Sequence, residues 1–148
     1  MSEYSVYLRP SMLIKEIFLI NGICQPNPNE SWRCVTLKMP DGIGTVDDLI
    51  CIVDREDLEV GRYYSDSSYA LNPHIQIIVR AVGFGRSYDK MREITDFCDV
   101  VRDYTVRFKS INYELVNMTR TNNVQYNGVD GTGHRHVHTI EYDLKLNY

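Results

Sequence analysis

The stretch of residues 73–82, PHIQIIVRAV, constrains the fold of this chain more than any other. It is rich in isoleucine and valine, which favour strands, and Gly83-Phe84-Gly85 ends it. A helix is predicted soon afterwards, over residues 87–105, because apolar side chains at 91, 94, 98 and 101, with 97, 104 and 108 beside them, form one broad stripe. We expect that stripe to pack in the core.

The remaining apolar runs predict one more helix and four more strands. The helix covers residues 11–22, with Pro10 and Ser11 at its start and Asn21-Gly22 at its end. The order helix, three strands, helix, two strands predicts an α+β fold, a mostly antiparallel sheet packed by two helices. A chain of 148 residues fits a single domain, residues 1–148. The four further strands are predicted over residues 32–39, 49–53, 111–118 and 134–146.

Two polar connections interrupt this pattern. Residues 54–72 are rich in Asp, Ser and Tyr, and residues 121–133 are rich in Asn and Gly, which favour turns. A connection as long as residues 54–72 is uncommon inside a compact domain and is usually functional or mobile. Residues 121–133 are predicted to be a turn region between the last two strands.

The composition narrows the possible partners and compartments. The net charge is −4 and the isoelectric point about 5.5, so the chain is not built to hold a phosphate backbone by bulk charge. Four cysteines occur singly, without a C-x-x-C pair, which indicates a reducing compartment, and three of them, Cys34, Cys51 and Cys98, lie in apolar runs where cysteine is usually a small buried side chain. Residues 12–23 are apolar but too short to span a bilayer, so we expect neither a membrane partner nor a signal peptide.

Three of the four histidines stand at alternate positions in the segment HRHVH. Residues two apart on a strand share a face, so His134, His136 and His138 are predicted to continue the apolar face of Ile140, while Arg135 lies on a largely charged opposite face. Two such imidazoles lie about 7 Å apart at the backbone, which makes His134 and His136 candidate metal ligands. The sequence singles out no third ligand, and the alternative is a strand start at a sheet edge or subunit contact. We expect no bound metal or cofactor.

Motifs for catalysis are absent from the sequence. It contains no G-x-S-x-G, no P-loop and no H-E-x-x-H. Gly83-Phe84-Gly85 lies between a strand and a helix but lacks the third glycine of a dinucleotide loop, and such glycines serve a tight turn equally well. We therefore expect no enzyme activity and no catalytic residue.

The second half of the chain has a continuous pattern that resembles a known family. Residues 72–80, NPHIQIIVR, precede a turn, an amphipathic helix and residues 111–120, INYELVNMTR; residues 128–135, GVDGTGHR, then open a closing strand that ends in LKLN. This order resembles the tail-terminator (tail-completion) proteins of long-tailed bacteriophages. In that family a strand of the type Pro-x-Ile-Gln-Ile-x-Val-Arg precedes the long helix, and a Gly-x-Asp-x-x-Gly-Arg/His turn opens the final strand. The resemblance covers roughly residues 71–147, and the Tyr- and Ser-rich residues 54–72 depart from the compact members.

The resemblance implies a structural subunit of the virion, assembled in the host cytoplasm. Such subunits form a ring, usually of six copies, which caps the tail tube when the tail reaches its length. The ring then offers a surface to the neck and connector proteins, and DNA only passes through its channel. The implied partners are therefore other copies of the chain, the tail-tube protein and the neck proteins.

Contact residues are predicted in the two polar connections, since binding residues concentrate on loops. An ordinary solvated loop is the alternative at each position. The candidates are Arg62, Tyr63, Tyr64 and Tyr69 in the first connection, and Arg120, Asn122, Asn123, Tyr126, His134 and Arg135 in the second connection and the residues directly beside it, over 120–135.

Three other functions remain open from the sequence. A different neck or head-completion connector would have a similar construction. A small metal-dependent enzyme would use His134 and His136 with a ligand from elsewhere in the chain. A cytoplasmic interaction module would stay monomeric and would not assemble with tail components.

Overall fold

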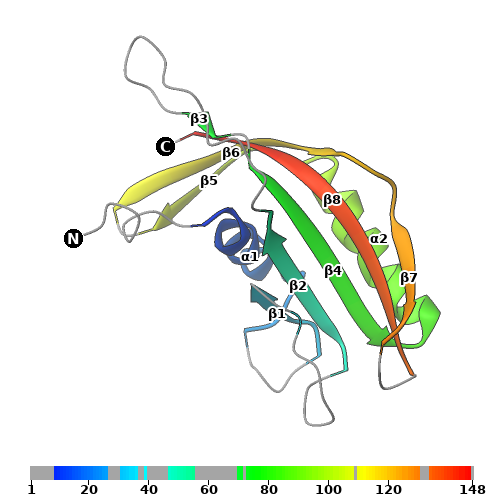
Figure 1. The fold of residues 1–148 in the computed structure, drawn as a ribbon. Helices are drawn as coiled ribbons and strands as arrows, with labels where there is room; N and C mark the ends of the chain where they lie inside the picture. Colours follow the sequence, from blue (N-terminus) through cyan, green and yellow to red (C-terminus); the bar gives the residue numbers. More distant parts are fainter. Residues whose placement is uncertain are drawn as a thin grey trace.

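A computed structural model describes residues 9–26, 31–36, 39, 47–55, 70–71, 73–108, 110–130 and 134–147. These residues form two helices and eight strands, which confirms the predicted α+β class (Figure 1). The elements are α1 (Pro10–Ile20), β1 (Arg33–Thr36), β2 (Leu49–Asp54), β3 (Ala70–Leu71), β4 (His74–Val82), α2 (Phe84–Cys98), β5 (Arg102–Phe108), β6 (Ile111–Arg120), β7 (Gln125–Val129) and β8 (Arg135–Asn147).

The strands form one curled sheet with the order β1-β2-β4-β8-β6-β5. Only the β1–β2 pair is parallel among the described strands, so the expected mostly antiparallel sheet is confirmed. The closing strand β8 lies at the centre of the sheet. One edge of β8 pairs with β4 and β3, and the other edge pairs with β6 and β7. In Figure 1 β8 runs through the middle of the arch, from the β3 end to the β7 end.

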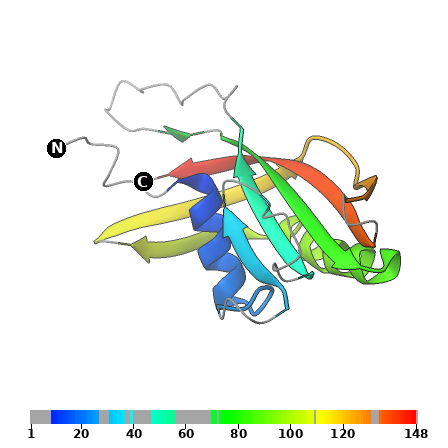
Figure 2. The same ribbon diagram turned by 60° about the horizontal axis from the view of Figure 1, so that its bottom comes forward.

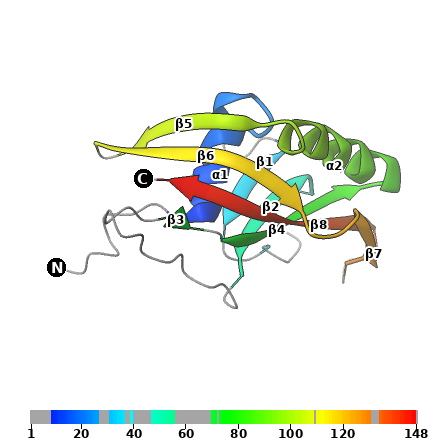
Figure 3. The ribbon, with the colours of Figure 1, turned by 90° about the horizontal axis from the view of Figure 1, so that it is seen from above.

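Both helices lie on the same side of the sheet, and the hydrophobic core fills the space between the helices and the sheet (Figures 2 and 3). The alternating residues Ile75, Ile77 and Val79 of β4 are fully buried in this core. Phe18 of α1 contacts Phe97 of α2 edge to face, with ring centroids 6.1 Å apart, so the helices meet each other as well as the sheet. The helical residues buried in the same cluster are Leu13, Ile14, Ile17 and Phe18 of α1 and Met91, Ile94 and Cys98 of α2.

The predicted first helix is confirmed to within two residues at either end. Pro10 occupies the first turn, where a proline costs no hydrogen bond. Asn21 ends the helix, because its side-chain Nδ2 donates to the carbonyl of Ile17 at 2.8 Å. Gly22 follows with φ +71°, a conformation that suits glycine.

The second helix was predicted to run too far. It covers Phe84–Cys98 instead of residues 87–105, and Arg102–Phe108 forms strand β5. The apolar positions explain the error, since Tyr104 and Phe108 fit the helical stripe and, together with Val106, also fit a strand period of two. Pairing with β6 decided in favour of the strand.

The two polar connections also contain strand that the sequence did not predict. β7 (Gln125–Val129) lies within the predicted turn region, and the short β3 lies within residues 54–72. Asn127 and Gly128 indicate a turn locally, and Gly128 does adopt a positive φ of +84°. The ladder to β8 absorbs this irregularity through a register shift between Tyr126 and Val129. At the first predicted strand, β1 begins at Arg33, and residues 37, 38 and 40 lie outside the described residues.

The four cysteines are free and buried, which confirms the predicted burial of Cys34, Cys51 and Cys98. Within the described residues, no helix is long and apolar enough to cross a membrane.

Candidate functional site

The three clustered histidines share one strand but have three different environments. His134 has a side chain 54% exposed, with its Nε2 3.7 Å from Asp47 Oδ1. His136 is half-buried, and its Nδ1 lies 2.7 Å from the hydroxyl of Tyr126. His138 is only 1% exposed, and its Nδ1 lies 2.8 Å from Ser87 Oγ on α2. The histidine segment therefore passes from solvent into the core within five residues.

The predicted face of the closing strand is confirmed from His138 onward. His138, Ile140, Tyr142, Leu144 and Leu146 are buried at alternate positions. The opposite face differs from the prediction at its start, where Arg135 and Thr139 are buried, and it ends in the exposed residues Asp143, Lys145 and Asn147. His138 is thus held under α2 by the same alternation that builds the core.

The hydrogen bonds of Ser87 fix the tautomer of His138. The hydroxyl of Ser87 donates to the carbonyl of Val79 at 3.2 Å, and a carbonyl oxygen only accepts. The single hydroxyl hydrogen is then used, so His138 Nδ1 carries a hydrogen and donates it to Ser87 Oγ. Nε2 of His138 is left as an acceptor, and it has no hydrogen-bond partner among the described residues.

His138 is neutral at neutral pH. Burial lowers the pKa of His138 below its ordinary value of 6.5, and the charge on neighbouring His136 lowers it further. Ser87 is fully buried, so its hydroxyl is out of reach of a substrate. The pair therefore holds an imidazole in place and does not present a nucleophile.

Aromatic rings surround the imidazoles on the solvent side. The ring of Phe84 lies 4.9 Å from that of His138 and 5.0 Å from that of Tyr126. Tyr88 lies 5.9 Å from His138, and Tyr126 stacks on His136 at 5.8 Å. Phe84, Tyr88 and Tyr126 are 48%, 43% and 47% exposed, so each ring offers about half of its surface to solvent.

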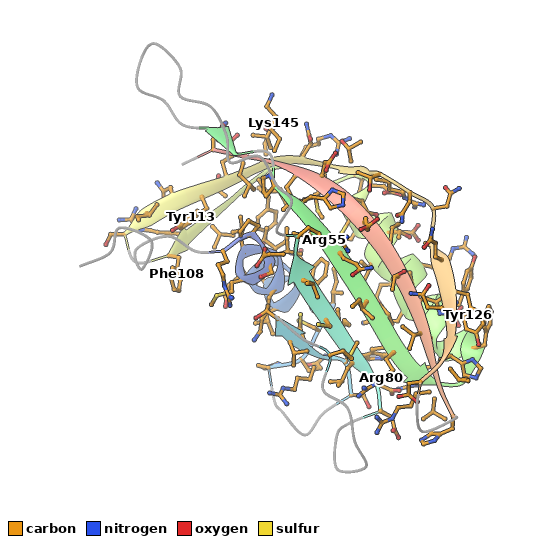
Figure 4. All side chains as sticks on the ribbon, in the orientation of Figure 1. Arg55, Arg80, Phe108, Tyr113, Tyr126 and Lys145 are labelled. Atoms are coloured by element: carbon orange, nitrogen blue, oxygen red, sulfur yellow. The ribbon has the colours of Figure 1, made fainter. Side chains whose placement is uncertain are left out.

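A cleft of about 520 Å³ opens between α2 and the strands β6 and β7. Its α2 wall is a second stripe on the helix, beside the stripe that packs in the core, and His138 lies in its lining. Tyr126 marks this edge of the molecule, beyond the start of α2 (Figure 4). The lining comprises Phe84, Tyr88, Met91, Arg92, Thr95, Asp96, Arg120, Asn123, Val124, Tyr126 and His138.

An ion pair fixes the end of β6 at this cleft. Arg120 Nε donates to Asp99 Oδ1 at 2.9 Å, and the hydroxyl of Tyr142 donates to the same oxygen at 2.9 Å. The bond to Arg120 holds the pKa of Asp99 below its ordinary value of 3.8, and the bond to Tyr142 acts in the same direction. Burial raises the pKa of the Tyr142 hydroxyl, which therefore keeps its hydrogen. Arg120 is thus anchored within its own chain.

Replacing Arg120 by alanine is expected to destabilise the protein by about 1 kcal/mol near neutral pH, because both side chains are about one third exposed and solvent screens the pair. The pKa of Asp99 is lower in the folded protein than its ordinary value. The stability that the ion pair contributes is therefore present above the ordinary pKa, and it is lost as the pH falls through the pKa of the folded protein. The difference between wild type and Arg120→Ala should therefore shrink below about pH 4 in urea titrations. Arg107→Ala, which removes an exposed arginine of β5, is the control and should show no such convergence. A difference that grows on acidification would contradict this account.

The candidate metal ligands are not joined by a third group. His134 is paired with Asp47, whereas His136 is bonded to Tyr126. Within the described part of the chain, no group of three or more His, Cys, Asp or Glu side chains is arranged to hold a metal ion.

The predicted contact residues occupy several different places. Arg120, Asn123 and Tyr126 line the cleft. The side-chain amide of Asn122 accepts a hydrogen bond from the backbone N–H of Glu141 at 2.9 Å and donates one to Glu141 Oε2 at 3.3 Å. Arg135 is 2% exposed, next to Asp47 and Asp130 of its own chain. His134 is exposed, and Arg62, Tyr63, Tyr64 and Tyr69 lie outside the described residues.

Sequence reasoning missed the residues that α2 contributes to the cleft. Phe84 was interpreted only as part of a tight turn, and Tyr88 and Ser87 were not singled out. A signal was present, because Phe84, Tyr88 and Arg92 are four residues apart and form a second stripe along the helix. What the sequence alone did not indicate is that β7 faces this stripe.

The comparisons with known proteins assign no family to the chain. No model of a known protein family matches it, and no curated protein matches it either.

Proposed function

We propose that this protein is a tail-terminator subunit of a long-tailed bacteriophage or a related tail-like particle. In this role it forms a ring, expected to contain six copies, that caps the tail tube and ends its growth. The ring then presents a surface to the neck and connector proteins, and DNA passes through its channel. The subunit acts by protein contact and not by catalysis.

The observation that carries the proposal is a patch of exposed apolar side chains at one end of the molecule. Monomeric proteins seldom gather large exposed apolar side chains in this way, and such patches mark protein contacts. The patch joins the end of β4, the start of α2 and β7, which meet at one corner in Figure 1. Its members are Val82, Phe84, Tyr88, Tyr126 and Val129, between 43% and 50% exposed.

Two further features support the same role. Residues 74–147 contain, in the order that the family resemblance implies, strand β4, helix α2, strand β6 and the closing strand β8, with β5 and β7 as additional strands between them. The net charge of −4 suits a channel through which DNA must pass without being held.

Sedimentation velocity over a range of concentrations tests the proposal. We expect a closed species of about six times the chain mass of 17.2 kDa, or an equilibrium between monomer and that species. Phe84→Asp should shift the equilibrium towards monomer, because a charge in an apolar contact is costly to desolvate. Asp89→Asn, on an exposed position of the same helix, is the matched control.

Electron microscopy of tails assembled with and without the protein separates termination from mere ring formation. Tubes of irregular and excessive length are expected when the protein is omitted. A ring of twelve copies at the head would instead favour a connector. A chain that stays monomeric and leaves tube length unchanged would overturn the proposal.

A further inference from the structure

Two of the four buried cysteines lie side by side in the core. Cys24 follows the end of α1, and Cys34 is the second residue of β1. Their side chains are 1% and 2% exposed, and their thiols share a hydrogen bond. Two thiols in such contact need only a short approach of the sulfur atoms to form a disulfide, whose geometry demands that the two residues already be neighbours.

The backbone holds this contact in place. The N–H of Gln25 donates to the carbonyl of Trp32 at 3.1 Å, and Gln25 pairs with Arg33 in an isolated parallel bridge. Cys24 and Cys34 stand directly beside these two bridged residues. The path of the chain after α1 therefore brings together two thiols that have no motif spacing in the sequence.

The two thiols are not equivalent. Cys34 donates to the sulfur of Cys24, because an alternative acceptor, the carbonyl of Val35, lies 4.0 Å away at the limit for sulfur. This hydrogen bond lowers the pKa of Cys24 below its ordinary value of 9.0; burial opposes the shift, and the charges of Lys15 and Lys90 favour it. The same bond and burial raise the pKa of Cys34. When the pair loses a proton, the nucleophilic thiolate is therefore on Cys24.

The other two cysteines have different surroundings and serve as internal references. Cys51 follows Ile50, the partner of Cys34 in the β1–β2 ladder, and consecutive residues of a strand point to opposite faces. Cys98 ends α2. Burial raises the pKa of both thiols, that of Cys51 to about 11, so neither is activated as a nucleophile.

The pair lies at a margin of the fold where local opening is cheapest. Among the described strands the four-residue β1 pairs with β2 alone, and it lies at the edge of the sheet beside α1 (Figure 1). Gln25, next to Cys24, is exposed. Segments with few hydrogen bonds open without global unfolding, so an oxidant as small as hydrogen peroxide can reach Cys24.

We propose that Cys24 and Cys34 form a redox-sensitive pair, which a peroxide converts into a disulfide that staples the end of α1 to the edge strand β1. The Cys24 sulfur attacks one peroxide oxygen, the O–O bond breaks, and the leaving hydroxide takes the proton of Cys24 to become water. Cys34 then attacks the Cys24 sulfur, the S–O bond breaks, and a second water leaves with the proton of Cys34. The two sulfur atoms lose two electrons, and the peroxide gains them.

Peptide mapping of the full-length protein tests the pair directly. The protein is treated with hydrogen peroxide, its remaining thiols are alkylated in denaturant, and it is digested with trypsin without reductant. Trypsin cleaves after Arg33, so Cys24 and Cys34 fall on separate peptides, residues 16–33 and 34–38. We expect these two peptides to be linked, with a mass two hydrogen atoms below their sum, and the other two cysteines to be alkylated.

Two serine variants separate the steps of the reaction. In Cys34→Ser a hydroxyl still donates to Cys24 but cannot close a disulfide, so peroxide should leave Cys24 as a sulfenic acid. Dimedone added with the denaturant traps that acid for mass spectrometry. Cys51→Ser is the matched control and should form the disulfide at the wild-type rate. A dimedone adduct on Cys51 or Cys98 instead of Cys24 would contradict the assigned roles.

Thermal unfolding shows whether the bond acts as a staple. Closing the loop of residues 24–34 should raise the unfolding midpoint by about 5 to 10 °C, and dithiothreitol should reverse the rise. Peroxide-treated Cys34→Ser controls for oxidised methionines and should show no such rise. Thiols that stay free while methionines oxidise, a link to Cys51 or Cys98, or a midpoint that falls on oxidation would overturn the proposal.

The thiol pair and the proposed ring can fail separately. A ring that forms in the reduced protein, together with thiols that stay free in peroxide, would overturn the redox pair and leave the terminator role standing. A linked peptide pair in a protein that forms no closed ring would support the redox pair and overturn the ring.

Discussion

Replacing Arg135 by alanine is expected to lower the free energy of unfolding by about 3 kcal/mol. The guanidinium is 2% exposed, and its Nε donates to Asp47 Oδ1 at 2.8 Å while Nη1 lies 3.6 Å from Asp130 Oδ2. Asp130 has a side chain only 14% exposed, so removal of the cation leaves a poorly solvated carboxylate behind. Urea denaturation gives the value, and an unchanged m-value would show that the two-state transition is preserved.

Two further variants separate charge from packing in this prediction. Arg135→Met keeps most of the side-chain volume without the charge, so it should recover the part of the loss that comes from packing. Lys145→Ala, at an exposed position of the same strand, should change stability by less than about 0.5 kcal/mol. A loss below about 1 kcal/mol for Arg135→Ala would mean that Asp47 and Asp130 are already well solvated.

Replacing Phe18 by alanine is expected to destabilise the protein by about 3 to 5 kcal/mol. The ring is fully buried and joins α1 to α2 through its contact with Phe97, so its removal leaves a cavity between both helices and the sheet. Because α2 forms one wall of the cleft, the same variant should also weaken any contact made there.

The matched control for Phe18→Ala lies two residues further along the same helix. Ile20 is 62% exposed, so Ile20→Ala should change the midpoint of urea denaturation very little. Equal losses from the two substitutions would contradict the described placement of α1. Thermal unfolding followed by circular dichroism provides an independent check on both variants.

Local periodicity was enough to predict most of the helices and strands. Alternation placed Ile75, Ile77 and Val79 on the buried face of β4, and the same rule placed His138, Ile140 and Tyr142 on the buried face of β8. These predictions succeed because burial on one face imposes a period of two on a strand.

Pairing between strands decided what periodicity left ambiguous. Residues 104 and 108 fit the helical stripe and also a strand period of two, and the ladder between β5 and β6 decides for the strand. β7 combines turn-forming residues with a bulge, and its pairing with the long β8 makes it a strand.

The candidate site required the tertiary structure most of all. The sequence determined an α+β chain with a histidine-bearing closing strand and a helix with an apolar stripe, because these follow from neighbours along the chain. It did not determine that α2 faces β7, that Ser87 holds His138 in one tautomer, or that Arg135 is buried beside Asp47. Ser87 and His138 are separated by 51 positions along the chain, and Asp47 and Arg135 are separated by 88. Only the packing of the helix on the curled sheet brings such distant residues together.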